Sequence, residues 1–262
     1  MSYEFIIYEE KEEIGILTIN RAEKRNALGL AAEEEMMACL KDAAKRHAVK
    51  VIIVKGAGPI FCAGHDRLEI LNRPVMEIRR LFHTSFNLMY TLRTIPQCVI
   101  AQVHGIAMAA GCHLAAACDL VAAGAEKAKL GMTGMVYSYN CSTPTVAVSR
   151  AVGQKKCMEM LMTGNLYSAQ EAKEFGLVNF VFPDDKLDEE TWNFARSICK
   201  QNSKYGIHMS KQVYYAQVEM TEWQAYHYTK EMMAVAGISA NSTEGFTAFL
   251  DKREPVWNDD TF

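Results

Sequence analysis

The stretch from Cys98 to Gly124 limits what this chain can fold into more than any other part of the sequence. Val99, Ile100 and Val103 favour a strand, and nearly every residue from 107 to 117 is small or apolar. A helix that is apolar on all of its faces is buried inside a protein. We therefore expect a strand, a tight turn of small residues, a buried helix and a second strand.

The beginning of this helix is a candidate anion site. The backbone N–H groups of a first helical turn have no partner within the helix, and they carry a partial positive charge. An oxygen that becomes negative during a reaction would be stabilised there without any side chain. The alternative is a tightly packed core helix with no chemical role, and this stretch alone does not decide between the two.

Composition and charge exclude several classes of protein. The chain has 262 residues, enough for one large domain or a domain with a small appendage, and its formal charge of −3 gives no reason to expect nucleic-acid binding. Its eight cysteines form no CxxC pair, which favours reduced thiols in a reducing compartment over disulfides or a metal site. The acidic N-terminus lacks the pattern of a signal or transit peptide, and no uninterrupted apolar run has the length of a membrane span. We expect a cytoplasmic protein without a membrane partner.

The order of the expected elements favours a mostly parallel sheet with helical crossovers. We expect a hairpin over 5–9 and 14–20, a helix over 30–47, a strand over 51–54, helical turns over 67–94 with a break near Pro74, an irregular loop over 129–144, helices over 145–152 and 154–162, and a last strand over 178–182. From residue 188 onward the pattern predicts only helices, over 188–200, 203–218, 222–235 and 243–253. The expected division is an α/β core over 1–187 and a helical region over 188–262.

Three stretches, 20–28, 61–66 and 104–112, together resemble the crotonase (enoyl-CoA hydratase/isomerase) superfamily, and the similarity continues to residues 245–253. The resemblance implies a crotonase-like ββα spiral core and a C-terminal helical region that forms trimers or dimers of trimers. It implies an acyl-CoA thioester as the ligand, with coenzyme A as part of the substrate and no metal or redox cofactor.

The resemblance assigns an oxyanion hole to the backbone N–H groups of His65 and Ala110. Ala110 stands where the family usually has glycine, and its methyl group requires an ordinary φ, so the hole depends on a helical conformation there. The resemblance also assigns contacts with coenzyme A, two of them from the C-terminal helix of a neighbouring subunit. These are Arg25, Ala27, Leu28, Ala63, Asp66 and Leu68, followed by Phe249 and Lys252 of the neighbour.

The chain departs from the family where a hydratase has two catalytic glutamates. Their positions hold His113 and Gly134, so both carboxylates that handle the protons of the attacking water are missing. His113 is either a general base or a hydrogen-bonded core histidine. Cys141 and Ser142 lie on the loop where some relatives place a catalytic acid, and either shape the acyl pocket or, for Cys141, supply a nucleophile if its pKa is lowered.

The stretch from Asn140 to Pro144, with both glutamates missing, resembles the enoyl-CoA hydratase domain-containing protein 3 subgroup of the superfamily. Tyr137, Tyr139 and Asn140 either line the pocket or pack between subunits. Three hypotheses remain: an acyl-CoA enzyme that catalyses isomerisation, hydrolysis or an atypical hydration; a non-catalytic acyl-CoA-binding or partner protein; and a trimeric scaffold without a coenzyme A site.

Overall fold

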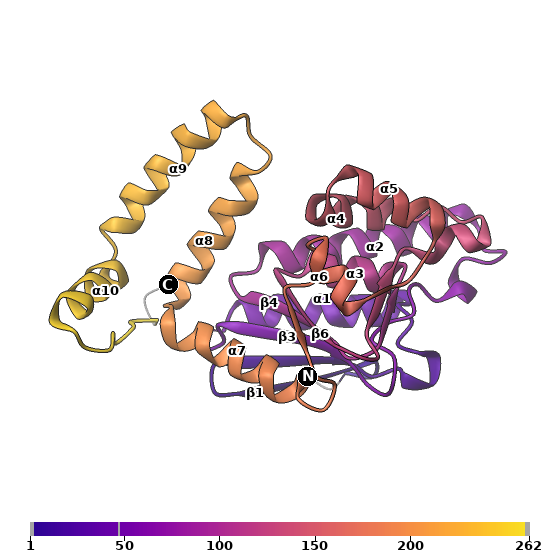
Figure 1. Ribbon diagram of the computed structural model, residues 1–262, viewed down its shortest axis with the longest axis horizontal. Coiled ribbons are helices and arrows are strands. Elements are labelled where there is room, and N and C mark those ends of the chain that lie inside the picture. The colour runs from indigo at the N-terminus through magenta and orange to yellow at the C-terminus, as the bar shows by residue number, and fades with distance from the viewer. Residues whose placement is uncertain (1–2, 47, 260–262) are drawn as a thin grey trace.

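The computed structural model describes residues 3–46 and 48–259, and a six-stranded sheet forms its centre (Figure 1). The strands lie in the order β1-β2-β3-β4-β6-β9. Only β1 and β2 pair antiparallel, as the expected hairpin, and every other neighbouring pair is parallel. The strands are Ile6–Lys11, Ile14–Ile19, Val51–Gly56, Cys98–Val103, Leu120–Gly124 and Phe180–Phe182. The predicted parallel sheet is confirmed.

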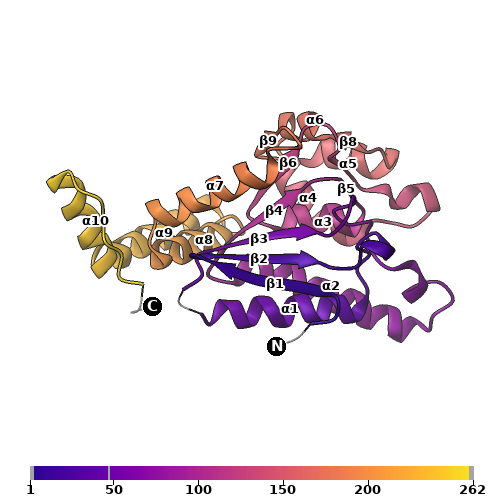
Figure 2. The same cartoon turned by 90° about the horizontal axis from the view of Figure 1, so that it is seen from below.

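Helices cover both faces of this sheet, which explains its continuous apolar strands. Alternate residues of a strand point to opposite faces. In β3, Val51 and Ile53 pack against α7 (Leu187–Gln201), whereas Ile52 and Val54 belong to the larger cluster that includes α1 (Leu30–Ala44) and α2 (Val75–Thr94). Figure 2 shows α7 on one side of the strands and α1 with α2 on the other. The expected helix over 30–47 thus ends at Ala44, and His47 lies outside the described residues.

A second, three-stranded sheet was not predicted from the sequence. It consists of β5 (Ile106–Met108), β7 (Lys129–Gly131) and β8 (Tyr167–Ser168). The expectation that the buried helix begins near residue 107 is therefore wrong, because β5 pairs with β7 and α3 (Ala110–Ala117) follows it. The expectation of an irregular stretch over 129–144 is also wrong in part, since it contains β7, the 3-10 helix η3 (Thr133–Tyr137) and the beginning of α4 (Ser142–Val152).

The remaining helices follow the expected order with small shifts at their ends. Short 3-10 helices η1 and η2 cover Ala22–Lys24 and Arg67–Glu69, and the others are α5 (Gln154–Thr163), α6 (Ala169–Glu174), α8 (Lys204–Gln217), α9 (Glu222–Gly237) and α10 (Ala240–Asp251). In the described part of the chain, no helix combines the length and apolar character that a membrane crossing needs.

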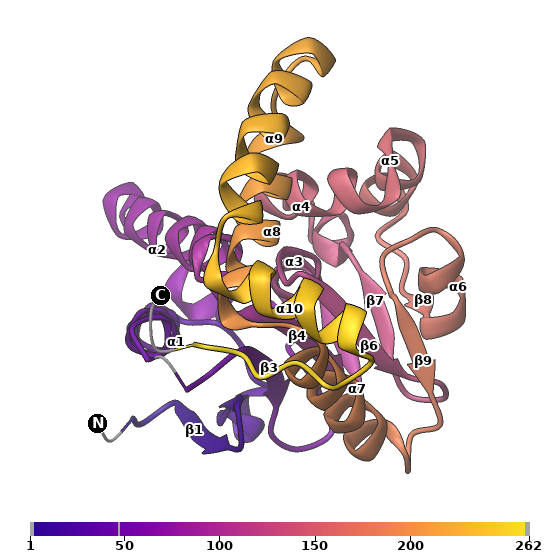
Figure 3. The same ribbon diagram turned by 90° about the vertical axis from the view of Figure 1, so that its left-hand side faces the viewer.

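The last three helices project away from the sheet, as Figures 1 and 3 show. Helix α8 is fastened to the core by Lys211, whose ammonium lies 2.7 Å from the Asp119 carboxylate and donates to the carbonyls of Leu92 and Gln97. Helix α9, by contrast, has no buried residue, and large side chains such as Trp223 are exposed. The region beyond α8 thus presents apolar faces that the chain itself does not cover.

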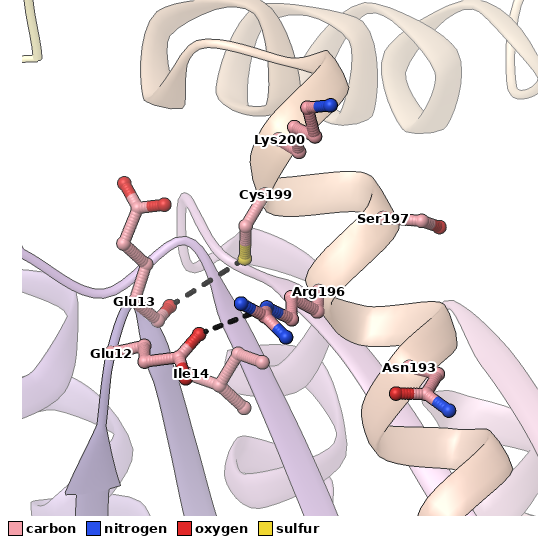
Figure 4. Close-up of a pocket in the computed structure, with 8 residues that line it drawn as sticks. All are labelled: Glu12, Glu13, Ile14, Asn193, Arg196, Ser197, Cys199 and Lys200. Carbon is pink, nitrogen blue, oxygen red and sulfur yellow. Dashed lines mark hydrogen bonds and ion pairs between the residues drawn. The ribbon is translucent and has the colours of Figure 1, made fainter.

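The amino ends of the parallel strands meet α7 around a surface hollow of about 550 Å³ (Figure 4). The Arg196 guanidinium lies 3.2 Å from the Glu12 carboxylate, and the Cys199 thiol donates a weak hydrogen bond to the Glu13 carbonyl. These contacts hold the β1–β2 turn against α7, so we interpret the hollow as the seam between two elements.

Candidate active site

The turn after β3 and the beginning of α3 lie side by side at the carboxyl ends of the strands (Figure 2). An isolated parallel bridge joins Cys62 to Ala107: the Cys62 N–H donates to the Ile106 carbonyl at 3.1 Å, and the Met108 N–H donates to the Cys62 carbonyl at 3.0 Å. A methyl group added to Gly64 would lie 3.4 Å from the backbone nitrogen of Ala110. The contact is close because residue 64 has no side chain.

Two backbone N–H groups remain without a protein acceptor at this junction. Asp66 donates to the Leu28 carbonyl at 2.8 Å, and Ala109 donates to the Gly131 carbonyl at 2.9 Å. Among the described residues, His65 and Ala110, each adjacent to one of these donors, donate their backbone N–H to no protein group. Two unused donors on neighbouring segments can both bind one oxygen atom.

Ala109 rather than Ala110 takes the unusual backbone conformation. Ala109 has φ 51° and ψ −114°, a region that side chains other than glycine rarely occupy, and it directly precedes α3. Ala110 is the first residue of the helix and has no positive φ, as its methyl group requires. The predicted helical conformation at Ala110 is confirmed, and the strain of about 1–3 kcal/mol falls one residue earlier.

His65 and Ala110 both line a cavity of about 530 Å³. The Arg67 guanidinium stacks 4.2 Å from the ring centre of Tyr137 and joins two sides of the cavity. None of the residues lining it, all within the described part of the chain, is Asp or Glu. They are Ala63, His65, Arg67, Ile70, Leu71, Phe82, Ala109, Ala110, Thr133, Gly134, Tyr137, Tyr139, Asn140, Cys141, Ser142, Thr143 and Pro144. The structure thus gathers Ala63, both predicted donors, Cys141, Ser142 and the three loop residues 137, 139 and 140 around one cavity.

The comparisons with known proteins agree with this architecture. The model of the enoyl-CoA hydratase/isomerase family matches residues 9–260. The chain belongs to that family. Enoyl-CoA hydratase domain-containing protein 3, mitochondrial, is 36% identical in zebrafish (Danio rerio; 95% of this chain, 86% of the relative) and 37% identical in human (92% and 80%). Their names describe mitochondrial proteins, so the expectation of a cytoplasmic location is not confirmed.

Solved structures of the family superimpose closely on this chain. Enoyl-CoA hydratase from Mycobacterium smegmatis matches with a TM-score of 0.93 at 35% identity, covering 97% of this chain and 99% of the other. Human enoyl-CoA hydratase domain-containing protein 3 matches with the same TM-score and identity, covering 97% of this chain and all of the other. The predicted crotonase-like fold and the resemblance to that subgroup are therefore confirmed.

His113, which the resemblance places at the first glutamate position, is buried and is not among the residues that line the cavity. Its Nδ1 has no hydrogen-bond partner among the described residues. Burial, with smaller contributions from the nearby His65 and Arg93, lowers the pKa of His113 to about 3. A base with so low a pKa has little driving force to take a proton near pH 7.

Gly134, which the resemblance places at the second glutamate position, leaves no room for a side chain. A Cβ atom there would collide with the carbonyl oxygen of Tyr139 and would lie 2.5 Å from the Cys141 sulfur. The Gly134 N–H donates to that sulfur at 3.2 Å, whereas burial has the larger effect and raises the pKa of the Cys141 thiol. Cys141 is thus held as a protonated thiol in the wall of the cavity, and Ser142 is exposed at the beginning of α4.

The first set of expected coenzyme A contacts lies beside the turn. Ala63 donates to the Arg25 carbonyl at 3.0 Å, and Leu28 donates to the Gly64 carbonyl at 2.8 Å, so residues 25–28 run alongside the turn over residues 63–66. The side chain of Leu28 is fully buried, which leaves only its backbone for a ligand.

Asp66 and Leu68 stabilise the same turn. The Asp66 carboxylate lies 3.3 Å from the Arg21 guanidinium and accepts the Leu68 N–H at 3.2 Å, so it braces the turn. The Leu68 side chain is exposed. Contact of either residue with coenzyme A stays a prediction.

Phe249 and Lys252 lie far from the cavity within one chain. Both are exposed at the end of α10, and Figure 2 shows α10 at the opposite end of the molecule from β5 and α3. The predicted contact with coenzyme A of a neighbouring subunit stays a prediction.

The surroundings of the His65 side chain were not predicted from the sequence. Its Nε2 lies 2.9 Å from the Ser85 hydroxyl, which donates to the Glu33 carboxylate at 2.6 Å. Glu33 is fully buried. One signal was available, because Glu33 falls on the apolar stripe of its helix, one turn before Met36 and Met37. A charged residue on a core face indicates a buried polar network.

Proposed function

We propose that this chain binds an acyl-CoA thioester and holds the thioester carbonyl oxygen between the backbone N–H groups of His65 and Ala110. The observation that carries the proposal is the pair of unused donors on adjacent segments at the border of one cavity. Membership of the enoyl-CoA hydratase/isomerase family supports the choice of ligand. Each preorganised donor of this kind is worth about 3 kcal/mol when the oxygen becomes negative.

The proposed reaction begins with the polarised carbonyl. Such a carbonyl stabilises the enolate that forms when the α-carbon loses a proton, and isomerisation can proceed from it. The same polarisation favours attack of water on the carbonyl carbon, with release of the coenzyme A thiol, which is hydrolysis of the thioester. Ordinary hydration needs one group that takes a proton from the attacking water and one that delivers a proton to the α-carbon. The described cavity lining offers no carboxylate for either task. The neutral state of His113 and Cys141 favours a second candidate, a protein that binds the thioester without converting it.

We propose further that the assembly contains three or six copies of the chain. The apolar side chains exposed on α9 and α10, among them Trp223, Ile238 and Phe249, support an interface between copies. In such an assembly Lys252 of one copy would reach the coenzyme A bound by another. Sedimentation equilibrium should find three or six chains per particle, and a monomer at micromolar concentration would contradict the proposal.

Incubation with a mixed pool of acyl-CoA thioesters tests binding and conversion together. Mass spectrometry should recover at least one thioester bound to the protein and should reveal a product formed from it. Calorimetry then compares that thioester with the thioether analogue in which the carbonyl is replaced by a methylene group. Loss of two hydrogen bonds predicts about tenfold weaker binding of the thioether. Equal affinities, or no binding of any thioester, would overturn the proposal, whereas binding without a product would favour the non-catalytic candidate.

A further inference from the structure

We infer that the imidazole of His65 is the proton acceptor at the α-carbon of the bound thioester, held in one tautomer by Ser85 and Glu33. The inference rests on the proposed thioester site and adds a side-chain role to a residue whose backbone N–H was the only part considered so far. Two observations carry it: the hydrogen-bonded chain behind the ring, and the position of the ring in the wall of the cavity.

The hydrogen-bonded chain fixes which nitrogen is basic. A serine hydroxyl has a single proton, and Ser85 donates it to the Glu33 carboxylate at 2.6 Å. At 2.9 Å from His65 Nε2, the same oxygen must then accept, so Nε2 carries the proton. In a neutral imidazole the other nitrogen is the acceptor. Nδ1 of His65 is therefore the nitrogen with the free electron pair.

The buried carboxylate orients this ring through Ser85. Glu33 is fully buried, and its Oε1 lies 3.6 Å from His65 Nε2. Its second oxygen has no partner among the described residues. A buried carboxylate needs a hydrogen-bond donor, so Glu33 holds the Ser85 hydroxyl and, through it, the imidazole in one orientation. A base that is oriented by a third group is the arrangement that catalytic triads use.

The residue that carries this ring also lines the cavity. The His65 ring meets the Phe82 ring edge-on with the centres 5.0 Å apart. Nδ1 makes no hydrogen bond with the described residues and is not among their enclosed, unpartnered polar atoms. With the carbonyl oxygen at the backbone N–H of the same residue, as proposed above, we place the α-carbon next to this ring.

The neighbouring charged groups leave His65 as the base. Glu33 faces the ring from α1, Ser85 and Phe82 from α2, and His113 from α3, while Arg67 follows in η2 and lines the same cavity. His113 is neutral near pH 7 because its pKa is low, so it neither repels the proton nor competes for it. The thiol of Cys141 is protonated, and Arg67 is a permanent cation.

The step balances without any further reactant. The α-carbon C–H bond breaks, its proton goes to Nδ1, and its electron pair forms the carbon–carbon double bond of the enolate. The electrons of the C=O bond move to the oxygen, which accepts hydrogen bonds from the N–H groups of His65 and Ala110. Return of a proton from the imidazolium to the α-carbon or to a conjugated carbon restores the starting thioester or gives its isomer.

Exchange of the α-hydrogens of butyryl-CoA for deuterium in D₂O tests the step without knowledge of the natural substrate. We expect the full-length protein to catalyse the exchange, measured by mass spectrometry, and His65→Gln to slow it at least a hundredfold. The backbone N–H groups remain in that variant, so butyryl-CoA should bind with an affinity within about threefold of wild type by calorimetry, a change of under ~1 kcal/mol. His83→Gln is the matched control, because His83 is exposed and lies on α2, the helix that also carries Ser85. This variant should exchange the α-hydrogens at the wild-type rate.

Two further variants separate catalysis from folding. Ser85→Ala keeps the imidazole and should give a rate between those of wild type and His65→Gln. Glu33→Gln removes the carboxylate that accepts the Ser85 proton, so the tautomer of His65 is no longer fixed, and the exchange rate should again fall between those of wild type and His65→Gln. The affinity for butyryl-CoA should stay within about threefold of wild type in both variants. A purely structural role would weaken binding and exchange together.

The outcomes distinguish this inference from the proposed function. Failure of the wild-type protein to bind butyryl-CoA or any other thioester would overturn both. Binding without exchange, exchange by His65→Gln at the wild-type rate, or loss of exchange in His113→Gln alone would overturn the role of His65 and leave the thioester site in place.

Discussion

The cavity has two walls that are built in opposite ways. The amide wall, residues 63–66 together with 109–111, is fixed by hydrogen bonds with Leu28 and Gly131, which are remote in sequence from the segments that they hold. The loop wall, residues 133–144, is held by short-range bonds such as Tyr139 N–H to the Gly134 carbonyl at 3.0 Å. The fold itself therefore positions the amides, whereas the loop can change with little effect on the sheet. Gly134, where the resemblance expects a glutamate, lies in the loop wall, and the two proposed donors lie in the amide wall.

The largest effect should come from Gly111→Ala on the amide wall. A Cβ atom at Gly111 would collide with the backbone carbonyl of Cys62 and would lie 2.8 Å from its Cβ, so α3 must move away from the turn after β3. Overpacking against backbone costs about 3 kcal/mol or more. We expect a loss of that size in the free energy of unfolding, measured by chemical denaturation, together with loss of measurable thioester binding.

Gly237→Ala is the matched control for this change. Gly237 is also helical, at the end of α9, and an added Cβ would meet nothing within 4 Å. Replacement of an exposed helical glycine by alanine stabilises by up to about 1 kcal/mol. Equal losses in the two variants would mean that the amide wall is no more tightly built than a free helix.

A smaller effect is expected when glutamates are placed at both positions where the resemblance expects them, in His113→Glu/Gly134→Glu. The first position lies on α3 and the second in the loop wall. Because the Cβ of residue 134 meets Tyr139 and Cys141, the loop must shift, at a cost of about 1–3 kcal/mol. The carboxylates then do not reach the positions that hydration needs. We expect no hydration of crotonyl-CoA. Hydration would be detected as a loss of the absorbance of crotonyl-CoA.

The control for the loop is Val136→Glu, which adds the same charge at an exposed position of η3. It should fold with wild-type stability and should not hydrate crotonyl-CoA. Hydration that appears only in the double variant would contradict the idea that the two walls have diverged in function, because the cavity would then need nothing but glutamates at positions 113 and 134.

The two walls also differ in how far the sequence predicts them. The amide wall follows from local patterns, since the apolar strands and the small-residue turns around Gly64 and Gly111 indicate where backbone is exposed to a ligand. What the sequence does not contain is the pairing of β5 with β7, because strands of three residues carry no periodicity and their partners are remote. The beginning of α3 was therefore placed too early.

The network behind His65 shows the same limit for side chains. Glu33, His65 and Ser85 come from three separate elements, and no spacing in the sequence relates them. Only the tertiary packing of α1 on α2 brings them together. Likewise, His113 was an attractive base from its position in the motif, but its burial and its low pKa are consequences of packing that a motif cannot reveal.

The smallest expected effect sharpens the comparison on the amide wall itself. Ala109 has φ 51°, so the backbone strain lies at the residue that directly precedes the proposed donor Ala110. Ala109→Gly should remove that strain, and, after the larger entropy of an unfolded glycine is subtracted, should raise the free energy of unfolding by about 1 kcal/mol. Thioester affinity should stay within about threefold of wild type.

The same substitution at Ala116, inside α3, should instead destabilise by about 1 kcal/mol, because glycine is unfavourable in a helix interior. Opposite signs in chemical denaturation would show that the amide wall holds its donors against the preference of its own sequence, whereas two losses of equal size would place Ala109 in an ordinary conformation and remove that distinction between the walls.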